Sequence, residues 1–118
     1  MITREGRALL KNYIMSTFTH FKVGTGGDST NPNASDLDSP IGLIARIQSA
    51  GGTVVSSGDT AIDISFTLSG SAYPGNTLKE VGIFDSTGNT LLLRVNYDGI
   101  GPLNNNDEVE IKITLEVD

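Results

Sequence analysis

The stretch EVEIKITLEV, residues 108–117, decides the fold of this 118-residue chain. Apolar and polar side chains alternate strictly along it, and the apolar positions are Val109, Ile111, Ile113, Leu115 and Val117. A strand with this period of two buries one face in a core and exposes the other to water, which is typical of antiparallel sheets. Residues 61–69, AIDISFTLS, repeat the pattern. The sequence therefore predicts an antiparallel sheet with one buried face.

Further strands are predicted at residues 20–26 and 41–48, and a β-hairpin is predicted at 80–95 because two apolar runs flank a turn rich in Ser, Thr, Gly and Asn. No helical pattern interrupts this series of strands and short turns. We expect a mainly β protein, an antiparallel β-sandwich of about six or seven strands over about residues 20–118. The length is that of a single domain, residues 1–118.

One α-helix is predicted, at about residues 3–18, and we expect it to cover one edge or end of the sandwich. Thr3 can serve as the N-cap, and Glu5 lies in the first turn, where the helix dipole favours a negative charge. The apolar side chains of the helix fall on one stripe, formed by Leu9, Leu10, Tyr13, Ile14 and Phe18. A helix packed on the sheet is the expected structure, and an amphipathic membrane helix is the alternative interpretation.

The predicted hairpin EVGIFDSTGNTLLLRV, residues 80–95, is apolar on both of its faces. Alternation directs one set of side chains into the core, namely Val81, Ile83, Leu91, Leu93 and Val95. Phe84 and Leu92 then lie on the opposite face, where polar residues would be expected. Such a hairpin either lies centrally under the helix or uses its second face as an interface. The second interpretation predicts an oligomer, with a trimer as the expected state.

Two polar or small residues of the hairpin have predicted structural roles. Gly82 allows another backbone or a large ring to approach closely, or it marks a bulge. Glu80 begins the strand at a position where its carboxylate can accept N–H bonds from a neighbouring loop. Together with Asp85, which ends the stretch EVGIFD, we treat these residues as a candidate structural motif or interface formed by Glu80, Gly82, Phe84, Asp85 and Leu92.

A long polar loop is predicted at residues 27–40, GDSTNPNASDLDSP. Its composition predicts little contribution to a core, and loops of this length are functional or disordered in most compact domains. As a hypothesis, this loop or the N-terminal arm carries a docking contact. Asp28, Asp36 and Asp38 would favour a basic patch on the partner, and Leu37 would offer a small apolar anchor.

Composition excludes several classes of function. The net charge is −6, the sequence pI is about 4.5, and the eight Lys and Arg residues are spread along the chain. Nucleic-acid binding and membrane-surface binding both need clustered basic residues, so neither partner is expected. The chain has no Cys, which excludes disulfides and thiolate metal sites. The N-terminus has no apolar run long enough for a signal peptide, so we expect synthesis in a cytoplasm.

The motifs of catalysis and cofactor binding are incomplete. His20 is the only histidine, and no G-x-S-x-G nucleophile pattern occurs. The stretch VGTGGDS lacks the Lys and following helix of a phosphate-binding loop. In DLDSPIG, residues 36–42, Pro40 replaces the third ligand of a calcium loop. We therefore predict no catalytic residue, no cofactor and no metal site, and the protein is not expected to be an enzyme.

The order of four stretches resembles a known family. These are ITREGRALLKNYI, KVGTG, KEVGIFDSTGNTLLLRV and EVEIKITLEV. They resemble a β-rich structural module of tailed-phage virion proteins from tail, collar and fibre gene regions. The resemblance implies a virion protein that docks onto other virion proteins of the capsid or tail and self-associates as a homo-oligomer. Fibre proteins usually continue into a repetitive shaft, whereas this sequence stops at Asp118. We therefore expect a tail, baseplate or fibre-attachment component or a capsid-decorating cement protein.

A binding module is the alternative function. Small β-sandwiches with polar loops also serve as stand-alone carbohydrate- or surface-binding modules, which stack sugars on exposed aromatic rings. The chain has no Trp and three Tyr. Of these, Tyr73 and Tyr97 are predicted to lie in loops, where a sugar could reach them.

Overall fold

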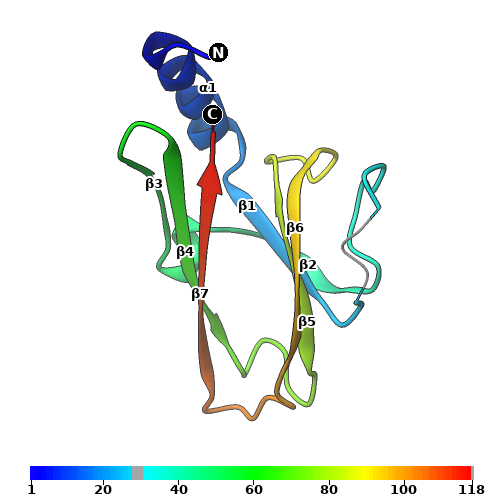
Figure 1. Cartoon of the computed structure of the whole chain (residues 1–118). Coiled ribbons are helices and arrows are strands. Elements are labelled where there is room, and N and C mark those ends of the chain that lie inside the picture. Colours follow the sequence, from blue (N-terminus) through cyan, green and yellow to red (C-terminus); the bar gives the residue numbers. More distant parts are fainter. Residues whose placement is uncertain (28–30, 118) are drawn as a thin grey trace.

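The computed structural model describes residues 1–27 and 31–117 and confirms the predicted fold class (Figure 1). Seven antiparallel strands form two sheets packed as a sandwich, with one N-terminal helix in the described residues. The elements are α1 (Arg4–Thr17), β1 (His20–Gly24), β2 (Pro40–Arg46), the short 3-10 helix η1 (Gln48–Ala50), β3 (Thr53–Ser57), β4 (Ala61–Ser69), β5 (Leu78–Phe84), β6 (Leu91–Ile100) and β7 (Glu108–Glu116).

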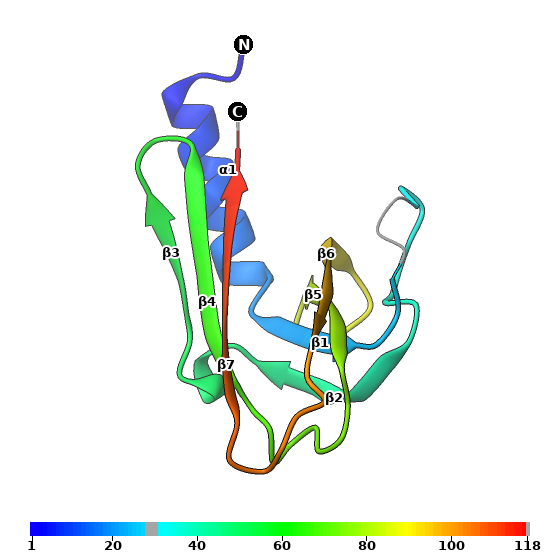
Figure 2. The same ribbon diagram turned by 60° about the horizontal axis from the view of Figure 1, so that its bottom comes forward.

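The two sheets contain four and three strands. The order in the larger sheet is β2-β1-β5-β6, and the order in the smaller sheet is β3-β4-β7 (Figures 1 and 2). The two strands with strict alternation, β4 and β7, pair with each other over nine residues, from Ala61 opposite Glu116 to Ser69 opposite Glu108. Their register has no shift, so the apolar sides of both strands face the same way, as the sequence predicted.

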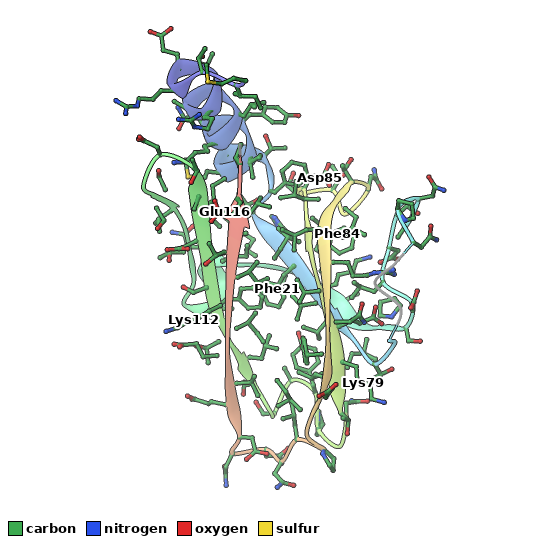
Figure 3. All side chains as sticks on the ribbon, viewed as in Figure 1. Phe21, Lys79, Phe84, Asp85, Lys112 and Glu116 are labelled. Atoms are coloured by element: carbon green, nitrogen blue, oxygen red, sulfur yellow. The ribbon has the colours of Figure 1, made fainter. Side chains whose placement is uncertain are left out.

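The core lies between the sheets, and an aromatic pair joins them. The rings of Phe21 from β1 and Phe66 from β4 are stacked, with centroids 4.1 Å apart and planes at 17°. Phe21 lies between the two sheets (Figure 3). Val81 and Ile83 of β5 are fully buried beside them, as predicted. Apolar burial of this kind is the main favourable term in folding.

One strand was not predicted. β3, with the sequence TVVSS, lies at the edge of the smaller sheet and pairs with β4. It is short and follows the turn at η1, and Val54 is half-buried against the core while Val55 is exposed. The signal for it was the β-branched run Thr53–Val55, which fits a pleated surface.

The helix α1 extends from one end of the sandwich, beside the turn between β3 and β4 (Figures 1 and 2). Thr3 is the N-cap, as predicted, because its hydroxyl accepts a hydrogen bond of 3.1 Å from the N–H of Gly6. The Cα radius of gyration is 14.5 Å, compared with about 13.5 Å for a compact chain of this length. The projecting helix accounts for this elongation.

Candidate docking surfaces

Glu80 joins the hairpin to the loop after β1. Its carboxylate is fully buried and accepts three backbone hydrogen bonds: from Gly26 at 2.7 Å, from Asp38 at 2.9 Å and from Ser39 at 2.8 Å. The predicted acceptor role of Glu80 is confirmed, and the neighbouring loop is the polar loop 27–40 with its approach from β1. Hydrogen bonds from several N–H groups satisfy the buried charge in the way that an isolated carboxylate requires.

The glycines of KVGTGG, residues 22–27, make room for this carboxylate. A Cβ atom on Gly24 or on Gly26 would lie 2.6 Å from Glu80 Oε2. A Cβ on Gly24 would also lie 2.6 Å from the carbonyl oxygen of Ser39. The stretches KVGTG and EVGIFD therefore meet at one structural contact.

Gly82 permits the close approach that was predicted, and the group that approaches is Leu37. A Cβ on Gly82 would lie 2.8 Å from Leu37 Cδ2 and from Phe84 Cε1, and 3.1 Å from Leu91 Cδ1. Leu37 is only 5% exposed and Phe84 is fully buried. The second face of the hairpin is therefore covered by the chain's own loop, and neither the helix nor another subunit is needed to cover it.

This burial corrects two expectations. Leu37 is not an exposed anchor for a partner, because its side chain packs within the fold on the outer face of the larger sheet. The expectation that the loop contributes little to packing is wrong for the same reason. Leu37 also covers part of the second hairpin face, which weakens the support of that face for a trimer, and the oligomeric state stays a prediction.

A register shift changes which residues of β6 face the core. Phe84 pairs with Leu91 and Ile83 pairs with Leu93, so the pairing slips by one residue between them. Leu92 packs against the main core, and Leu91 lies near Gly82 on the outer face. The sequence predicted Leu91 in the core and Leu92 on the outer face. This assignment is wrong because simple alternation takes no account of such a bulge.

The acidic residues of the candidate docking loop form ion pairs within the chain. Asp36 lies 3.2 Å from Lys22 Nζ, and Asp38 lies 3.0 Å from Arg94 Nη1. The Arg94 side chain is only 5% exposed, so this second pair is shielded from water on one side. Asp28, the fourth candidate, lies outside the described residues. The described part of the loop therefore holds the hairpin through these contacts, while Asp36 and Asp38 remain exposed, so a docking contact through the two aspartates stays a prediction.

Asp85 organises the turn between β5 and β6. Its Oδ1 accepts hydrogen bonds from the Thr87 hydroxyl at 2.9 Å and from the backbone N–H groups of Asn89 and Thr90. The Thr87 bond is the largest cause of a lowered pKa for Asp85, and the backbone bonds act in the same direction. Gly88 supplies the positive φ of the turn, +76°. Asp85 and Phe84 lie at the same end of the hairpin (Figure 3).

The helix α1 turns its basic face toward the protein. Lys11 is 5% exposed, and its Nζ donates a hydrogen bond of 2.6 Å to the carbonyl oxygen of Gly58 in the β3–β4 turn. Arg4 lies 3.2 Å from Asp59 in the same turn. Three of the eight Lys and Arg residues of the chain belong to this helix, whereas it contains a single acidic residue, Glu5. The helix is therefore attached partly through polar contacts to an acidic body.

The apolar face of the same helix points away from the protein. Leu9 is 72% exposed, Tyr13 is 63% exposed and Leu10 is 44% exposed. Among the described residues, eight large apolar side chains are exposed. Five of them lie in the first thirteen residues, where exposed apolar side chains are therefore most concentrated: Met1, Ile2, Leu9, Leu10 and Tyr13. We call these five residues the N-terminal apolar surface.

The predicted helix stripe is thus only partly correct. Phe18 is buried and Ile14 packs against the core, but Leu9, Leu10 and Tyr13 do not pack on the sheet. Sequence reasoning missed this surface because it assumed that the apolar face of a helix packs inward. The missed signal was Lys11, a charged residue in the middle of the helix that needs a partner when it is buried.

The two tyrosines proposed for sugar stacking are poorly placed for it. Tyr97 lies in β6 and not in a loop, and its hydroxyl is buried with no hydrogen-bond partner among the described residues. Burial, with a smaller contribution from the charge of Glu80, raises the pKa of Tyr97 to about 12. Burial also raises the pKa of Tyr73. Tyr13 on α1 is the exposed aromatic residue.

His20, the single histidine of the sequence, contacts its neighbour in the chain. His20 Nδ1 lies 2.8 Å from the Thr19 hydroxyl. The parts of the chain that the structure describes hold no group of three or more His, Asp or Glu side chains placed to bind a metal ion. Within residues 1–27 and 31–117, no helix is long and apolar enough to cross a membrane. No protein-family model matches the chain, and no curated protein matches it either.

Proposed function

We propose that this protein is a non-enzymatic structural protein of a tailed-phage virion, which docks onto another virion protein through α1. It would serve as a tail, baseplate or fibre-attachment component or as a capsid-decorating cement protein. The observation that carries the proposal is the orientation of α1, with Lys11 buried and Leu9, Leu10 and Tyr13 exposed. The resemblance of KVGTG and EVGIFD to tailed-phage structural modules supports the choice of a virion.

The exposed apolar face of α1 is unfavourable in water. Monomeric proteins rarely leave a contiguous apolar surface in water, and such surfaces mark sites of interaction. An amphipathic helix that lays its apolar face into a groove is a common mode of protein recognition. The partner we infer is therefore a virion protein with an apolar groove that receives Leu9, Leu10 and Tyr13.

The loop and hairpin have a different role in this proposal. Glu80 holds the loop against the larger sheet through three backbone N–H groups, and Leu37 packs on Gly82. These contacts fix the loop on the larger sheet, and the buried core joins the two sheets to each other. A rigid body that carries a projecting helix loses little conformational freedom when it docks, which favours stable assembly. We also propose that assembled copies contact one another as a homo-oligomer.

Particle incorporation of a helix variant tests the proposal. Replacing Leu9, Leu10 and Tyr13 together by Gln introduces residues that favour helices and removes the three helical members of the N-terminal apolar surface. We expect the melting temperature to change little, because these side chains are exposed, while incorporation into particles by complementation is lost. The matched control is Ala8→Gln with Asn12→Gln, which alters two exposed positions of the same helix. Normal incorporation of the folded triple variant would contradict docking through α1.

A further inference from the structure

The sandwich has four strand edges, and three of them carry features that discourage pairing with another chain. β2 contains Pro40 and a glycine, Gly42, at φ +72°. β3 is only five residues long. β6 has two register shifts against β5, and Gly99 lies at φ +120°. Short edges, prolines, bulges and irregular backbone are the usual means by which proteins block edge-to-edge association.

The fourth edge, β7, lacks these features. It has nine residues, contains neither Pro nor Gly, and pairs with β4 in an unbroken register. No other strand of the described residues pairs with its opposite side. The N–H and C=O groups on that side of a regular strand form a template for another strand.

We propose that β7 pairs with β7 of a second copy of this chain, antiparallel about a two-fold axis at Ile111. The two three-stranded sheets would become one continuous six-stranded sheet. This pairing goes beyond the docking function of α1 and uses a different surface. α1 contacts β3 and β4 at the other side of the smaller sheet.

The order of charges along β7 supports a second copy as the partner. With Ile111 opposite itself, Glu110 of each copy lies opposite Lys112 of the other, and Glu108 lies opposite Thr114. The pairing therefore contains two opposite-charge pairs and no like-charge pair from Glu108 to Thr114. Opposite charges directly across antiparallel strands are stabilising, and like charges are destabilising.

The neighbouring registers are less favourable. A shift that places Lys112 opposite itself also places Glu108 opposite Glu116 twice. The shift in the other direction places Glu110 opposite itself. Registers that differ by an odd number would set apolar residues of one copy against polar residues of the other, because side chains alternate between faces. Charge complementarity thus selects the Ile111-centred register among those that use most of the strand.

The side chains involved are available for this contact. The Lys112 side chain is 75% exposed and the Glu110 side chain is 61% exposed, and within one chain they lie 3.2 Å apart. Both are on the outer face of the smaller sheet, where Figure 3 shows Lys112 pointing away from the larger sheet. In the paired strands each lysine would lie between its own Glu110 and that of the other copy.

A groove beside β7 gives the pairing an apolar component. A cavity of about 190 Å³ lies between β6 and β7, and its apolar lining is Val81, Val95, Tyr97, Ile100, Ile111 and Ile113. Val95 is 37% exposed there, although the sequence predicted it in the core. The inner face of a paired β7 would bring Val109 and Ile111 of the second copy to the open side of this groove. Backbone pairing would add about one hydrogen bond per residue pair on average.

Charge-reversal variants of the full chain test the register. Lys112→Glu alone and Glu110→Lys alone would each place like charges across the two-fold axis. We expect each to weaken self-association, measured by analytical ultracentrifugation, by about tenfold. An equimolar mixture of the two single variants should associate as tightly as the wild-type chain, because every opposed pair is then Glu with Lys. The double variant E110K/K112E should also associate as the wild type does.

The mixture separates this pairing from effects within one chain, since an altered contact inside β7 would not be restored by a second variant. Glu108→Lys is the matched control: it changes the net charge as Glu110→Lys does but lies opposite Thr114, so association should be retained. A wild-type chain that stays monomeric up to about 1 mM, or a mixture no tighter than the single variants, would overturn the proposal. So would association that depends on Leu9, Leu10 and Tyr13 and not on Lys112. Particle incorporation of these variants reports on the docking function separately.

Discussion

Glu80 is a single residue that connects segments 54 positions apart in the sequence. Its carboxylate is the acceptor for the N–H groups of Gly26, Asp38 and Ser39. We expect Glu80→Gln to lower the free energy of unfolding by about 3 kcal/mol, because the amide removes the charge and turns an N–H₂ group toward N–H donors. Urea denaturation would measure the loss.

Glu108→Gln is the matched control for this substitution, since Glu108 is exposed at the start of β7. Surface changes of this kind stay within about 0.5 kcal/mol. If Glu80→Gln were equally mild, the three hydrogen bonds would not be a principal attachment of the loop, and Leu37 and the two ion pairs of Asp36 and Asp38 would have to hold it.

Tyr97 makes the stability of the folded protein depend on pH at high pH. Its pKa is raised from the ordinary 10.0 to about 12, so the folded state binds the phenol proton more tightly than the unfolded state does. The resulting stabilisation is fully present below pH 10.0 and is lost as the pH rises through about 12. In a spectrophotometric titration of tyrosinate, the transition at about pH 12 should disappear in Tyr97→Phe. Identical titration curves for the wild type and Tyr97→Phe would contradict the assignment.

At the scale of elements, the loop and the hairpin are coupled through Leu37 and Gly82. Gly82→Ala would overpack this contact and should cost about 1–3 kcal/mol. Leu37→Ala should cost about 2–5 kcal/mol through lost burial. Because the shorter side chain at position 37 leaves room for a methyl group at 82, the double variant should cost less than the sum of both. Thermal or urea unfolding of the four proteins gives the coupling energy.

Gly27→Ala is the control for the glycine substitution, since a Cβ there meets no atom within 4 Å. Strict additivity of the two substitutions would show that Leu37 does not pack on Gly82. For the same physical reason, deleting residues 29–38 and bridging the gap with Gly-Ser should lower the melting temperature, because it removes both Leu37 and the N–H of Asp38 from their contacts.

At the scale of the whole molecule, the two sheets are joined through their apolar faces and the stacked pair Phe21–Phe66. Phe66 is 1% exposed. We expect Phe66→Ala to lower the free energy of unfolding by about 3–5 kcal/mol, the range for buried aromatic residues. Val55→Ala, at a position 47% exposed on the outer face, should have a small effect. A loss below about 1 kcal/mol for Phe66→Ala would mean that the core is not centred on this pair.

The sequence by itself determined the strands with strict alternation, the start of the helix and the faces of β4 and β7. These depend on local periodicity and on contacts a few residues apart, such as the cap at Thr3. It also indicated that Glu80 accepts N–H bonds and that Gly82 admits a close neighbour. The partners in both contacts, the loop backbone and Leu37, come from a distant segment, so they could not be predicted.

Only the tertiary structure decided which face of α1 is free and which strand edges are unprotected. The inward face of the helix depends on the position of Gly58, 47 residues from Lys11, which no local pattern specifies. The exchange of Leu91 and Leu92 between faces depends on one slip in the pairing of β5 with β6. Hydrophobic periodicity and helix capping act over a few residues, whereas packing and strand register are set by contacts between segments far apart in the chain. For that reason the interaction surfaces could be identified only in the folded molecule.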